Sequence, residues 1–373
     1  AVGADALSIN TIGNDNVCLG SNALSSNIVG SSNVAIGTNV LKNSIANFNT
    51  AAGYHAMSSN TIGKDNVAFG ANALEMHVEG DSNTALGKNS LFVSNGAQRN
   101  TALGAQSLEN VTTGSFNTAV GFLAGKSIID GNNNVAIGDT VNVNGNQNIV
   151  IGASSGGVNP GNDNVAIGWR VMQNNSSNRN VAIGSNAMAV NALNADDNTA
   201  IGYNALLNVQ GTYNIAIGRD AGLGSNNASN TKNIYIDNVG ANESNVIRIG
   251  DVHTANYQAG IFGTNVGGLG IGVYVNASRQ LGTLISLREE KENINDIDEE
   301  KNSYIINHLQ PKTFNFIKDE TKTLTNGLIV DEVMDIAPEL IVYKDNVPRS
   351  IYYDRLNMMM LKEIQRINKK LNM

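Results

Sequence analysis

The sequence is poor in the residues that build a large conventional core or a covalent framework. Of its 373 residues, 5% are aromatic, four are proline and one is cysteine, whereas 39 are glycine. The single cysteine, Cys18, excludes an intrachain disulfide. No run of about 18 apolar residues occurs, so no segment is expected to insert into a membrane. This composition favours a repetitive architecture over two or three ordinary domains.

Concentrated charge and clustered metal ligands are also missing. The formal net charge is −8 and is spread thinly, without a basic patch interleaved with aromatic residues, so nucleic acid is not expected as a partner. The four histidines are scattered without ligand spacing, at His55, His77, His253 and His308. We therefore expect no metal site and no cofactor.

What the sequence does contain is a five-residue unit that recurs through residues 1–250. The unit has the form Asn-(Val/Thr/Ile)-(Ala/Val/Cys)-apolar-Gly, and its copies are spaced mostly 16 to 17 residues apart. They open at Asn16, Asn33, Asn49, Asn66, Asn83, Asn100, Asn117, Asn134, Asn148, Asn164, Asn180, Asn198 and Asn214, and degenerate copies follow at Asn233 and Asn245. Residues 1–7 correspond to the second half of a copy, so we expect the chain to begin inside the array. A fixed period this short predicts a solenoid or a fibre.

Each copy is expected to form one short strand. Positions two and four of the unit point to one side of the strand, and the small third residue points to the other. The glycine that follows permits a turn, and a second apolar position, as in Asn-Ala-Leu at 22–24, 72–74 and 204–206, supplies a further inward contact. Stacking would place equivalent asparagines above one another, where their amides can bond neighbouring coils. One coil cannot bury its apolar side alone, so neighbouring coils and neighbouring chains are expected to stabilise it.

These repeats resemble the head repeats of YadA-like trimeric autotransporter adhesins and similar repeats in phage and viral tail fibres. The resemblance implies a mainly β fold, a left-handed parallel β-roll or β-solenoid shaft, assembled as a homotrimer. A monomeric solenoid is the alternative. Exposed aromatic residues could form a carbohydrate-binding surface or serve in packing between chains; these are Tyr54, Phe122, Trp169, Tyr203 and Tyr213.

The composition changes at Ser286. Residues 286–373 hold 13 of the 24 basic and 16 of the 32 acidic residues of the chain, so they predict a separate small α+β domain. We expect a neck or junction over 251–285, with a strand and a turn around Val273, Val275 and Leu281.

Within the C-terminal domain we expect a helix that begins at about Asp298 and ends before Pro311, and further helices over 331–336 and from about Asp354. Strands are expected over 313–316, 327–330, 340–343 and 350–353. The last helix places Met360, Ile364, Ile367 and Leu371 at coiled-coil spacing.

This second part resembles the intramolecular chaperone auto-processing domain at the C-termini of phage tailspikes and tail fibres. The resemblance rests on several ordered motifs: Leu281-Gly, Ser286-x-Arg288-x-x-Lys291-Glu-Asn-Ile, Leu309-x-Pro311, Gly327-Leu-Ile-Val-Asp-Glu-Val and Pro338-Glu-Leu-Ile-Val. It implies a Ser286–Lys291 dyad that cuts the chain once, at the bond between Ile285 and Ser286.

The chemistry of such a cut can be stated from the residues. The Ser286 hydroxyl must attack a carbonyl, most simply that of Ile285, and needs a base to take its proton. Lys291 can be that base only when neutral, a form that burial or a nearby cation such as Arg288 favours. Backbone N–H groups are the default oxyanion donors, with Asn293 or Glu292 as a further candidate. Two glutamates, Glu289 and Glu290, depart from the common family pattern, and an ionised carboxylate beside the ammonium opposes base function.

The sequence therefore predicts a homotrimeric viral or phage fibre on the virion surface, an extracellular structure that attaches to a host cell-surface receptor, with a glycan as one candidate. Its C-terminal domain would align the repeats and then cut itself off in a single turnover. Two alternatives remain open. One is a non-cleaving bacterial trimeric adhesin, which would need a C-terminal anchor of alternating strands. The other is a fragment of a glycan-degrading tailspike, although turn acids such as Asp196 and Asp197 form no evident catalytic pair.

Overall fold

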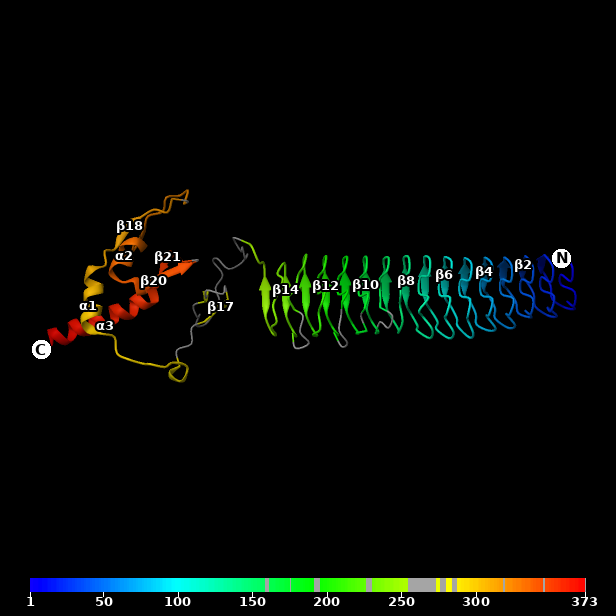
Figure 1. Ribbon diagram of the computed structural model, residues 1–373, viewed down its shortest axis with the longest axis horizontal. Helices are drawn as coiled ribbons and strands as arrows, with labels where there is room; N and C mark the ends of the chain where they lie inside the picture. Colours follow the sequence, from blue (N-terminus) through cyan, green and yellow to red (C-terminus); the bar gives the residue numbers. More distant parts are fainter. Residues whose placement is uncertain are drawn as a thin grey trace. The chain divides into compact units, whose positions relative to one another are not determined.

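The chain forms two compact units, Ala1–Asn256 and Tyr257–Met373, each described here by itself (Figure 1). The structure is a computed structural model, and it describes residues 1–157, 161–174, 176–190, 195–225, 230–253, 273–275, 280–283, 287–317, 319–344 and 346–372. The first unit is a repetitive shaft, and the second is a small α+β assembly.

The shaft is a parallel β-solenoid. Its described residues form one sheet of 15 three-residue strands, in which each strand pairs with the next along the chain (Figure 1). The strands are β1 Val17–Leu19, β2 Val34–Ile36, β3 Thr50–Ala52, β4 Val67–Phe69, β5 Thr84–Leu86, β6 Thr101–Leu103, β7 Thr118–Val120, β8 Val135–Ile137, β9 Ile149–Ile151, β10 Val165–Ile167, β11 Val181–Ile183, β12 Thr199–Ile201, β13 Ile215–Ile217, β14 Ile234–Ile236 and β15 Ile247–Ile249. The predicted mainly β solenoid is confirmed, whereas its left-handed sense and the trimer stay predictions.

The small third residue of each unit faces the interior of the shaft. Ala85 in β5 and Ala102 in β6 are fully buried and pair directly with each other across the sheet. The bulkier residues on either side of them point outward, and Leu86 and Leu103 are 48% and 42% exposed. Alternation along a strand thus assigns alanine to the core and the larger aliphatic residues to the outer face.

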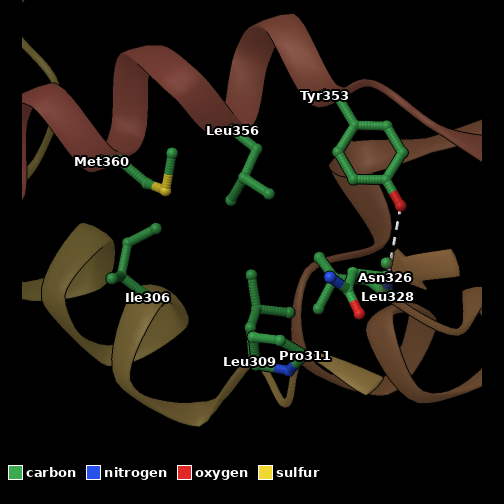
Figure 2. A pocket seen from close by; sticks show the side chains of 9 residues that line it. Ile306, Leu309, Pro311, Asn326, Leu328, Tyr353, Leu356 and Met360 are labelled. Carbon is green, nitrogen blue, oxygen red and sulfur yellow. Dashed lines mark hydrogen bonds between the residues drawn. The ribbon is translucent and has the colours of Figure 1, made fainter. Parts of the chain in front are cut away.

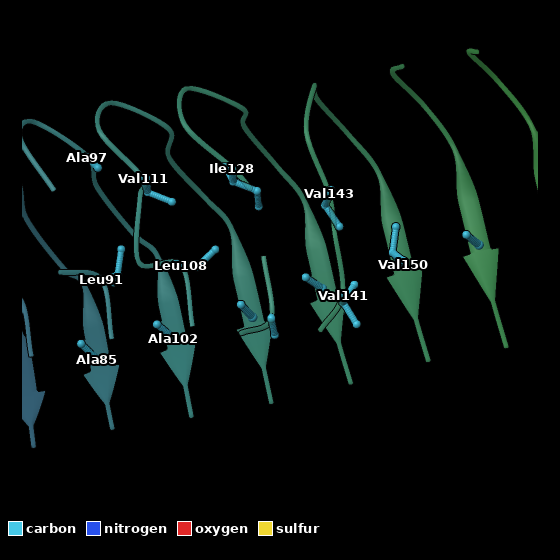
Figure 3. Close-up of a cluster of buried hydrophobic side chains, with 14 of the residues drawn as sticks. Ala85, Leu91, Ala97, Ala102, Leu108, Val111, Ile128, Val141, Val143 and Val150 are labelled. Carbon is cyan, nitrogen blue, oxygen red and sulfur yellow. The ribbon is translucent and has the colours of Figure 1, made fainter. Parts of the chain in front are cut away.

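A second inward column completes the core, as the sequence predicts for Asn-Ala-Leu. Leu74, Leu91 and Leu108 are fully buried in successive coils, and Figure 3 shows part of this cluster. Their φ angles lie between 47° and 52°, a left-handed conformation that costs a non-glycine residue free energy. The core is therefore a stack of thin layers, each completed by the coil above and the coil below.

The turn after each strand needs glycine for two reasons. Gly70 has a φ of +133°, which other residues rarely adopt, and a Cβ placed on it would lie 2.7 Å from the carbonyl oxygen of Gly87. Equivalent glycines stack in the neighbouring coils, so the backbones approach closely at this corner. The predicted turn is confirmed, with close stacking as an additional constraint.

The C-terminal unit begins, in its described part, with the two-stranded pairing of β16 Tyr274–Val275 and β17 Leu281–Gly282 and the 3-10 turn η1 Arg288–Glu290. Then follow α1 Glu299–His308, the antiparallel pair β18 Lys312–Phe314 and β19 Thr325–Gly327, α2 Val330–Ile336, and the 3-10 turn η2 Pro338–Leu340. The antiparallel pair β20 Ile341–Lys344 and β21 Val347–Ile351 leads into the last helix, α3 Tyr353–Leu371.

The first and last predicted helices are confirmed, but one predicted strand is wrong. Asp298 caps α1, because its Oδ1 accepts a hydrogen bond from the Lys301 N–H at 2.8 Å. The expected strand over 327–330 does not form: β19 ends at Gly327, and Val330 already begins α2. The physical reason is that Val333 and Ala337 lie one helical turn apart and are both buried in the core of this unit.

Candidate functional site

The predicted cleavage site lies at the start of the C-terminal unit. Ile285 and Ser286 lie outside the described residues, so the structure places only the residues that follow them. Leu287 leads into the short turn η1, in which the Glu290 N–H donates to the Leu287 carbonyl at 3.3 Å. Lys291 follows in an extended conformation, with its N–H donating to the Arg288 carbonyl at 3.2 Å. The two hydrogen bonds thus define the backbone path from Leu287 to Lys291.

The predicted supporting residues lie in the same short segment. Arg288 is the first residue of η1, and Asn293 adopts a left-handed conformation with φ of 53°. The Asn293 carbonyl accepts a hydrogen bond from Asn295 Nδ2 at 3.1 Å. Arg288, Lys291 and Asn293 are all exposed in the single chain. The described residues of the single chain therefore leave this segment open to solvent.

The helices α1 and α3 pack against each other through specific polar contacts. Asn302 Nδ2 donates to the Met359 carbonyl at 3.0 Å, and the Ser303 hydroxyl donates to Glu363 Oε1 at 3.2 Å. Arg366 Nε donates to Glu363 Oε2 at 2.9 Å, and this contact lowers the pKa of the Glu363 carboxyl. Glu363 therefore remains ionised between the two helices and holds them in one orientation.

Beside these helices is an open apolar groove of about 310 Å³ (Figure 2). Ile306, Leu356 and Met360 line it from α1 and α3, and the Tyr353 hydroxyl at one end accepts the Leu328 N–H at 3.2 Å. None of the predicted catalytic residues in the described part of the chain lines this groove. The described residues of its lining contain no carboxylate, imidazole or amine side chain that could carry acid–base chemistry.

The last helix carries apolar residues that the single chain leaves uncovered. Met360, Ile364, Ile367 and Leu371 are 43%, 55%, 44% and 78% exposed. Their spacing is that of the a and d positions of a coiled coil, as predicted. Such a stripe is typical of a helix that packs against further helices, so α3 offers a surface for self-association.

The shaft carries a second uncovered apolar surface, which we call the outer stripe. It consists of the last residue of each three-residue strand, which is apolar in every strand from β1 to β15. Examples on successive strands are Leu86 and Leu103, and near the two ends Leu19 and Ile217 are 51% and 40% exposed. Because the strands pair in register, these side chains form one continuous row along the sheet. Contiguous apolar surface of this kind marks an interface between proteins.

Sequence reasoning did not identify the outer stripe as an exposed surface. It distinguished the two sides of each strand but did not assign one of them to solvent. The signal available was the small third residue, since only the narrow side of such a strand fits inside a coil of about 17 residues.

The aromatic residues considered for carbohydrate binding are all exposed. Tyr54, Phe122, Trp169 and Tyr203 each directly follow the turn glycine of their coil, whereas Tyr213 precedes the unit asparagine. Their exposed fractions lie between 49% and 58%. Arg170 lies over the Trp169 ring at 5.1 Å. Four of them therefore form one interrupted column, and Tyr213 belongs to a different one.

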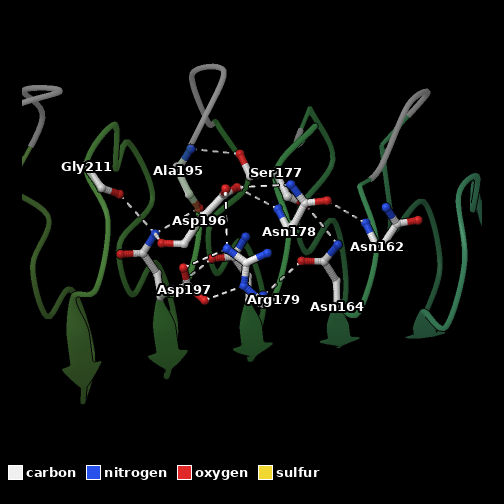
Figure 4. A network of polar contacts seen from close by, with 11 residues as sticks. Asn162, Asn164, Ser177, Asn178, Arg179, Ala195, Asp196, Asp197 and Gly211 are labelled. Atoms are coloured by element: carbon white, nitrogen blue, oxygen red, sulfur yellow. Dashed lines mark hydrogen bonds and ion pairs between the residues drawn. The ribbon is translucent and has the colours of Figure 1, made fainter.

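The acidic pair Asp196 and Asp197 has structural partners (Figure 4). Asp196 Oδ1 accepts the Asn178 N–H at 2.8 Å, and Asp197 accepts two hydrogen bonds from Arg179, at 2.7 and 2.9 Å. The hydrogen bond from Arg179 lowers the pKa of the Asp197 carboxyl. Both carboxylates join neighbouring coils, and an ionised, paired Asp197 does not suit the role of a general acid.

Among the described residues, no group of three or more His, Cys, Asp or Glu side chains is arranged to hold a metal ion. In the same part of the chain, no helix has both the length and the apolar character needed to cross a bilayer.

Residues 288–342 match the model of the family described as chaperone of endosialidase. The match starts inside the segment that carries Arg288 and Lys291 and runs through α1, α2 and the first part of β20. It covers less than half of the chain, and within the C-terminal unit it makes this chain similar to a chaperone domain of the tail-fibre and tailspike type. No curated protein matches the chain.

Proposed function

We propose that this chain is a homotrimeric viral or phage fibre protein whose C-terminal unit is a removable intramolecular chaperone. The observation that carries the proposal is the position of the family match, which begins at residue 288, two residues after the predicted nucleophile Ser286. A chaperone domain that starts directly after a candidate cleavage point, at the end of a repetitive shaft, suits release of that domain once the shaft is built.

The exposed apolar surfaces support self-association. The outer stripe follows the sheet from β1 to β15, and α3 adds a second apolar row in the C-terminal unit. Removing apolar surface from water stabilises an assembly by about 25 cal/mol per Å². Identical chains present identical stripes in the same order, so a closed ring of three copies would cover the stripe along the whole shaft.

The C-terminal unit would solve an alignment problem. Successive coils look alike, so three chains could associate one period out of register at little cost. Trimerisation of the C-terminal units would bring the three shafts together at one end and at high local concentration. The coils would then assemble from that end in a single register.

The proposed cleavage uses residues of the chain alone. Lys291, as a neutral amine, takes the proton of the Ser286 hydroxyl while the serine oxygen attacks the carbonyl carbon of Ile285. The carbonyl carbon forms an ester bond to the serine oxygen, and the bond to the Ser286 nitrogen breaks as that nitrogen is protonated. Water then hydrolyses the ester, which leaves a carboxylate on Ile285 and a free amine on Ser286. Arg288 favours the neutral lysine, and Asn293 is a candidate donor to the oxyanion.

Trimerisation would also activate the cleavage reaction. Lys291 and Arg288 are exposed to water in the single chain. Neighbouring chains that cover this segment in the trimer would remove that water. Cleavage would then follow trimerisation and make assembly irreversible, leaving a shaft that is kinetically trapped. The mature fibre would act on the virion surface and contact a host receptor, with a glycan among the candidates.

The experiment compares the full chain with its Ser286→Ala and Lys291→Ala variants on denaturing gels and by intact mass. The proposal expects the wild type to split into 1–285 and 286–373, and both variants to remain whole. An intact wild type that is nevertheless trimeric would remove the protease from the proposal and leave the chaperone. Splitting of the Ser286→Ala variant at the same bond would exclude the assigned nucleophile.

A further inference from the structure

One inward position of the shaft holds a residue unlike its equivalents. The third residue of the unit that opens at Asn233 is Tyr235, which lies in the middle of β14 and is fully buried. The preceding strands carry only small or medium residues there: Cys18, Ala35, Ala51, Ala68, Ala85, Ala102, Ala119, Ala136, Val150, Ala166, Ala182, Ala200 and Ala216. A phenol ring in a layer built for alanine needs space that the other coils do not provide.

Two glycines supply that space. Gly222 stands in the coil before Tyr235, at the position where Leu206 stands one coil earlier. A Cβ on Gly222 would lie 2.5 Å from Leu206 Cδ2 in the coil before and 3.1 Å from Tyr235 Cδ2 in the coil after. A Cβ on Gly240 would lie 2.7 Å from Tyr235 Cε1. The ring therefore fits between positions 222 and 240 because both lack side chains.

The polar end of the ring is also satisfied locally. The Tyr235 hydroxyl donates to the Ala241 carbonyl at 3.3 Å, and burial raises the pKa of this phenol, which keeps it a neutral donor. In the next strand the same column holds Arg248, whose Nε and Nη2 donate to the Glu243 carboxylate, each at 2.6 Å. This end of the shaft thus differs chemically from the repeats before it.

We infer that Tyr235, Gly222 and Gly240 form a register key that fixes which coil stacks on which. If the coil of β13 were looped out, β14 would stack on β12, and the ring would meet Leu206 in place of Gly222. Leu206 is fully buried and fills its layer, so the ring has no space there. Gly125 and Gly156 occupy the equivalent position only in the coils after β7 and β9, several coils away.

The register key lies at the C-terminal end of the repeat array. It lies in the last complete coils of the shaft, at the end of the repeat array that precedes the C-terminal unit in sequence. The inference concerns stacking within one chain, and it requires neither cleavage nor trimerisation.

The test replaces the register key by the residue types that pack in the other coils. In the double variant Tyr235→Ala/Gly222→Leu, both positions receive the residue types of the other coils, in which Leu74, Leu91 and Leu108 stack directly. The Tyr235→Phe variant is the matched control, because it keeps the ring and loses only the hydroxyl. All chains are the full-length protein with Ser286→Ala, so that cleavage does not enter, and each is refolded by dilution from urea.

We expect the double variant to yield at least threefold less protease-resistant shaft than the parent. New tryptic cuts should appear after Arg219 and Lys232, in the looped-out coil. In the native stack these segments are held by hydrogen bonds from Asp220 N to Tyr203 O at 2.8 Å and from Lys232 N to Thr212 O at 3.1 Å. The Tyr235→Phe control should refold as the parent does. Parental yield in the double variant would overturn the inference, and so would digestion spread along the whole shaft, which indicates a general packing defect. Light scattering on the parent reports separately on trimerisation.

Discussion

Asn66 binds the backbone of Asn83 in the following coil. Its side-chain oxygen accepts the Asn83 N–H at 2.8 Å and Asn83 Nδ2 at 3.1 Å. Asn83 Nδ2 also donates to the Ala97 carbonyl at 2.9 Å, and its own oxygen accepts the Asn100 N–H at 3.0 Å. Each asparagine is fully buried, so this column of amides is both the polar interior of the shaft and the link between its coils.

Replacing Asn83 by Ala should lower the free energy of unfolding of the shaft by about 2–4 kcal/mol, because it leaves the buried Asn100 N–H and Ala97 carbonyl without partners. Urea denaturation followed by circular dichroism measures the change. Asn95→Ala is the control, since Asn95 is exposed, and its effect should stay within about 0.5 kcal/mol. Similar losses at both positions would contradict the structural role of the column.

Much of the shaft follows from its sequence because one rule repeats in every coil. The asparagine column, the inward Ala-Leu pairs and the turn glycines were all predicted from residues that return at a fixed period. Tyr235 and Gly222 break that period, and their complementarity is visible only when the two coils are stacked. A repeat pattern predicts what the copies share, and three-dimensional contacts are needed to explain the exceptions.

The C-terminal unit was less predictable, because its elements depend on contacts distant in sequence. The capping residue Asp298 marks the start of α1 locally, whereas the apolar run at 327–330 resembles a strand until Val333 and Ala337 pack as a helical face. For the candidate site, the sequence indicated Ser286 and Lys291, and the structure adds that Lys291 lies in an exposed segment directly after a 3-10 turn.

The buried His77 should make the shaft sensitive to acid. It occupies the column position of Asn60, with Nε2 2.9 Å from the Gly80 carbonyl oxygen and Nδ1 3.0 Å from the Ser94 carbonyl oxygen. Burial lowers the pKa of His77, although these contacts and the nearby Glu79 and Asp81 oppose the shift. The unfolded chain therefore binds the proton more readily than the folded chain. Stability from this group is complete above about pH 6.5 and is lost as the pH falls below that value.

The measurement is the urea midpoint of the shaft at pH 7.5 and pH 5.5, for the wild type and for His77→Asn. Asn60 shows that asparagine suits this column, because its Nδ2 donates to the Gly63 carbonyl at 3.0 Å. We expect the midpoint of the wild type to fall more on acidification than that of the variant. An equal fall in both chains would show that His77 does not carry the pH dependence.

The outer stripe should be required for association of the shafts. The double substitution Leu86→Glu/Leu103→Glu places charges on paired positions of β5 and β6. Because both side chains are exposed in the single chain, each coil should still fold, while the proposed contact between chains becomes unfavourable. Analytical ultracentrifugation should show a smaller fraction of trimer. Thr113→Glu, at an exposed turn position, is the control and should leave the trimer fraction unchanged.

Damage to the core of the C-terminal unit should impair assembly of the distant shaft. Ile305 is 1% exposed, so Ile305→Ala should destabilise this unit by about 2–5 kcal/mol. If the unit is a chaperone, the refolded chain should then contain less protease-resistant shaft, although every shaft residue is unchanged. Ile317→Ala is the matched control because Ile317 is 93% exposed. Normal shaft yield from a chain whose C-terminal unit is unfolded would argue against the chaperone role.

The central claim, that the chain assembles as a trimer before it is cut, is tested most directly by the mass of the uncut protein in solution. The Ser286→Ala chain keeps both units joined, and one copy has a mass of 39.3 kDa. Multi-angle light scattering should give three times that mass. A mass of 39.3 kDa across the accessible concentration range would contradict the account, because a monomer leaves the outer stripe and the apolar row of α3 uncovered.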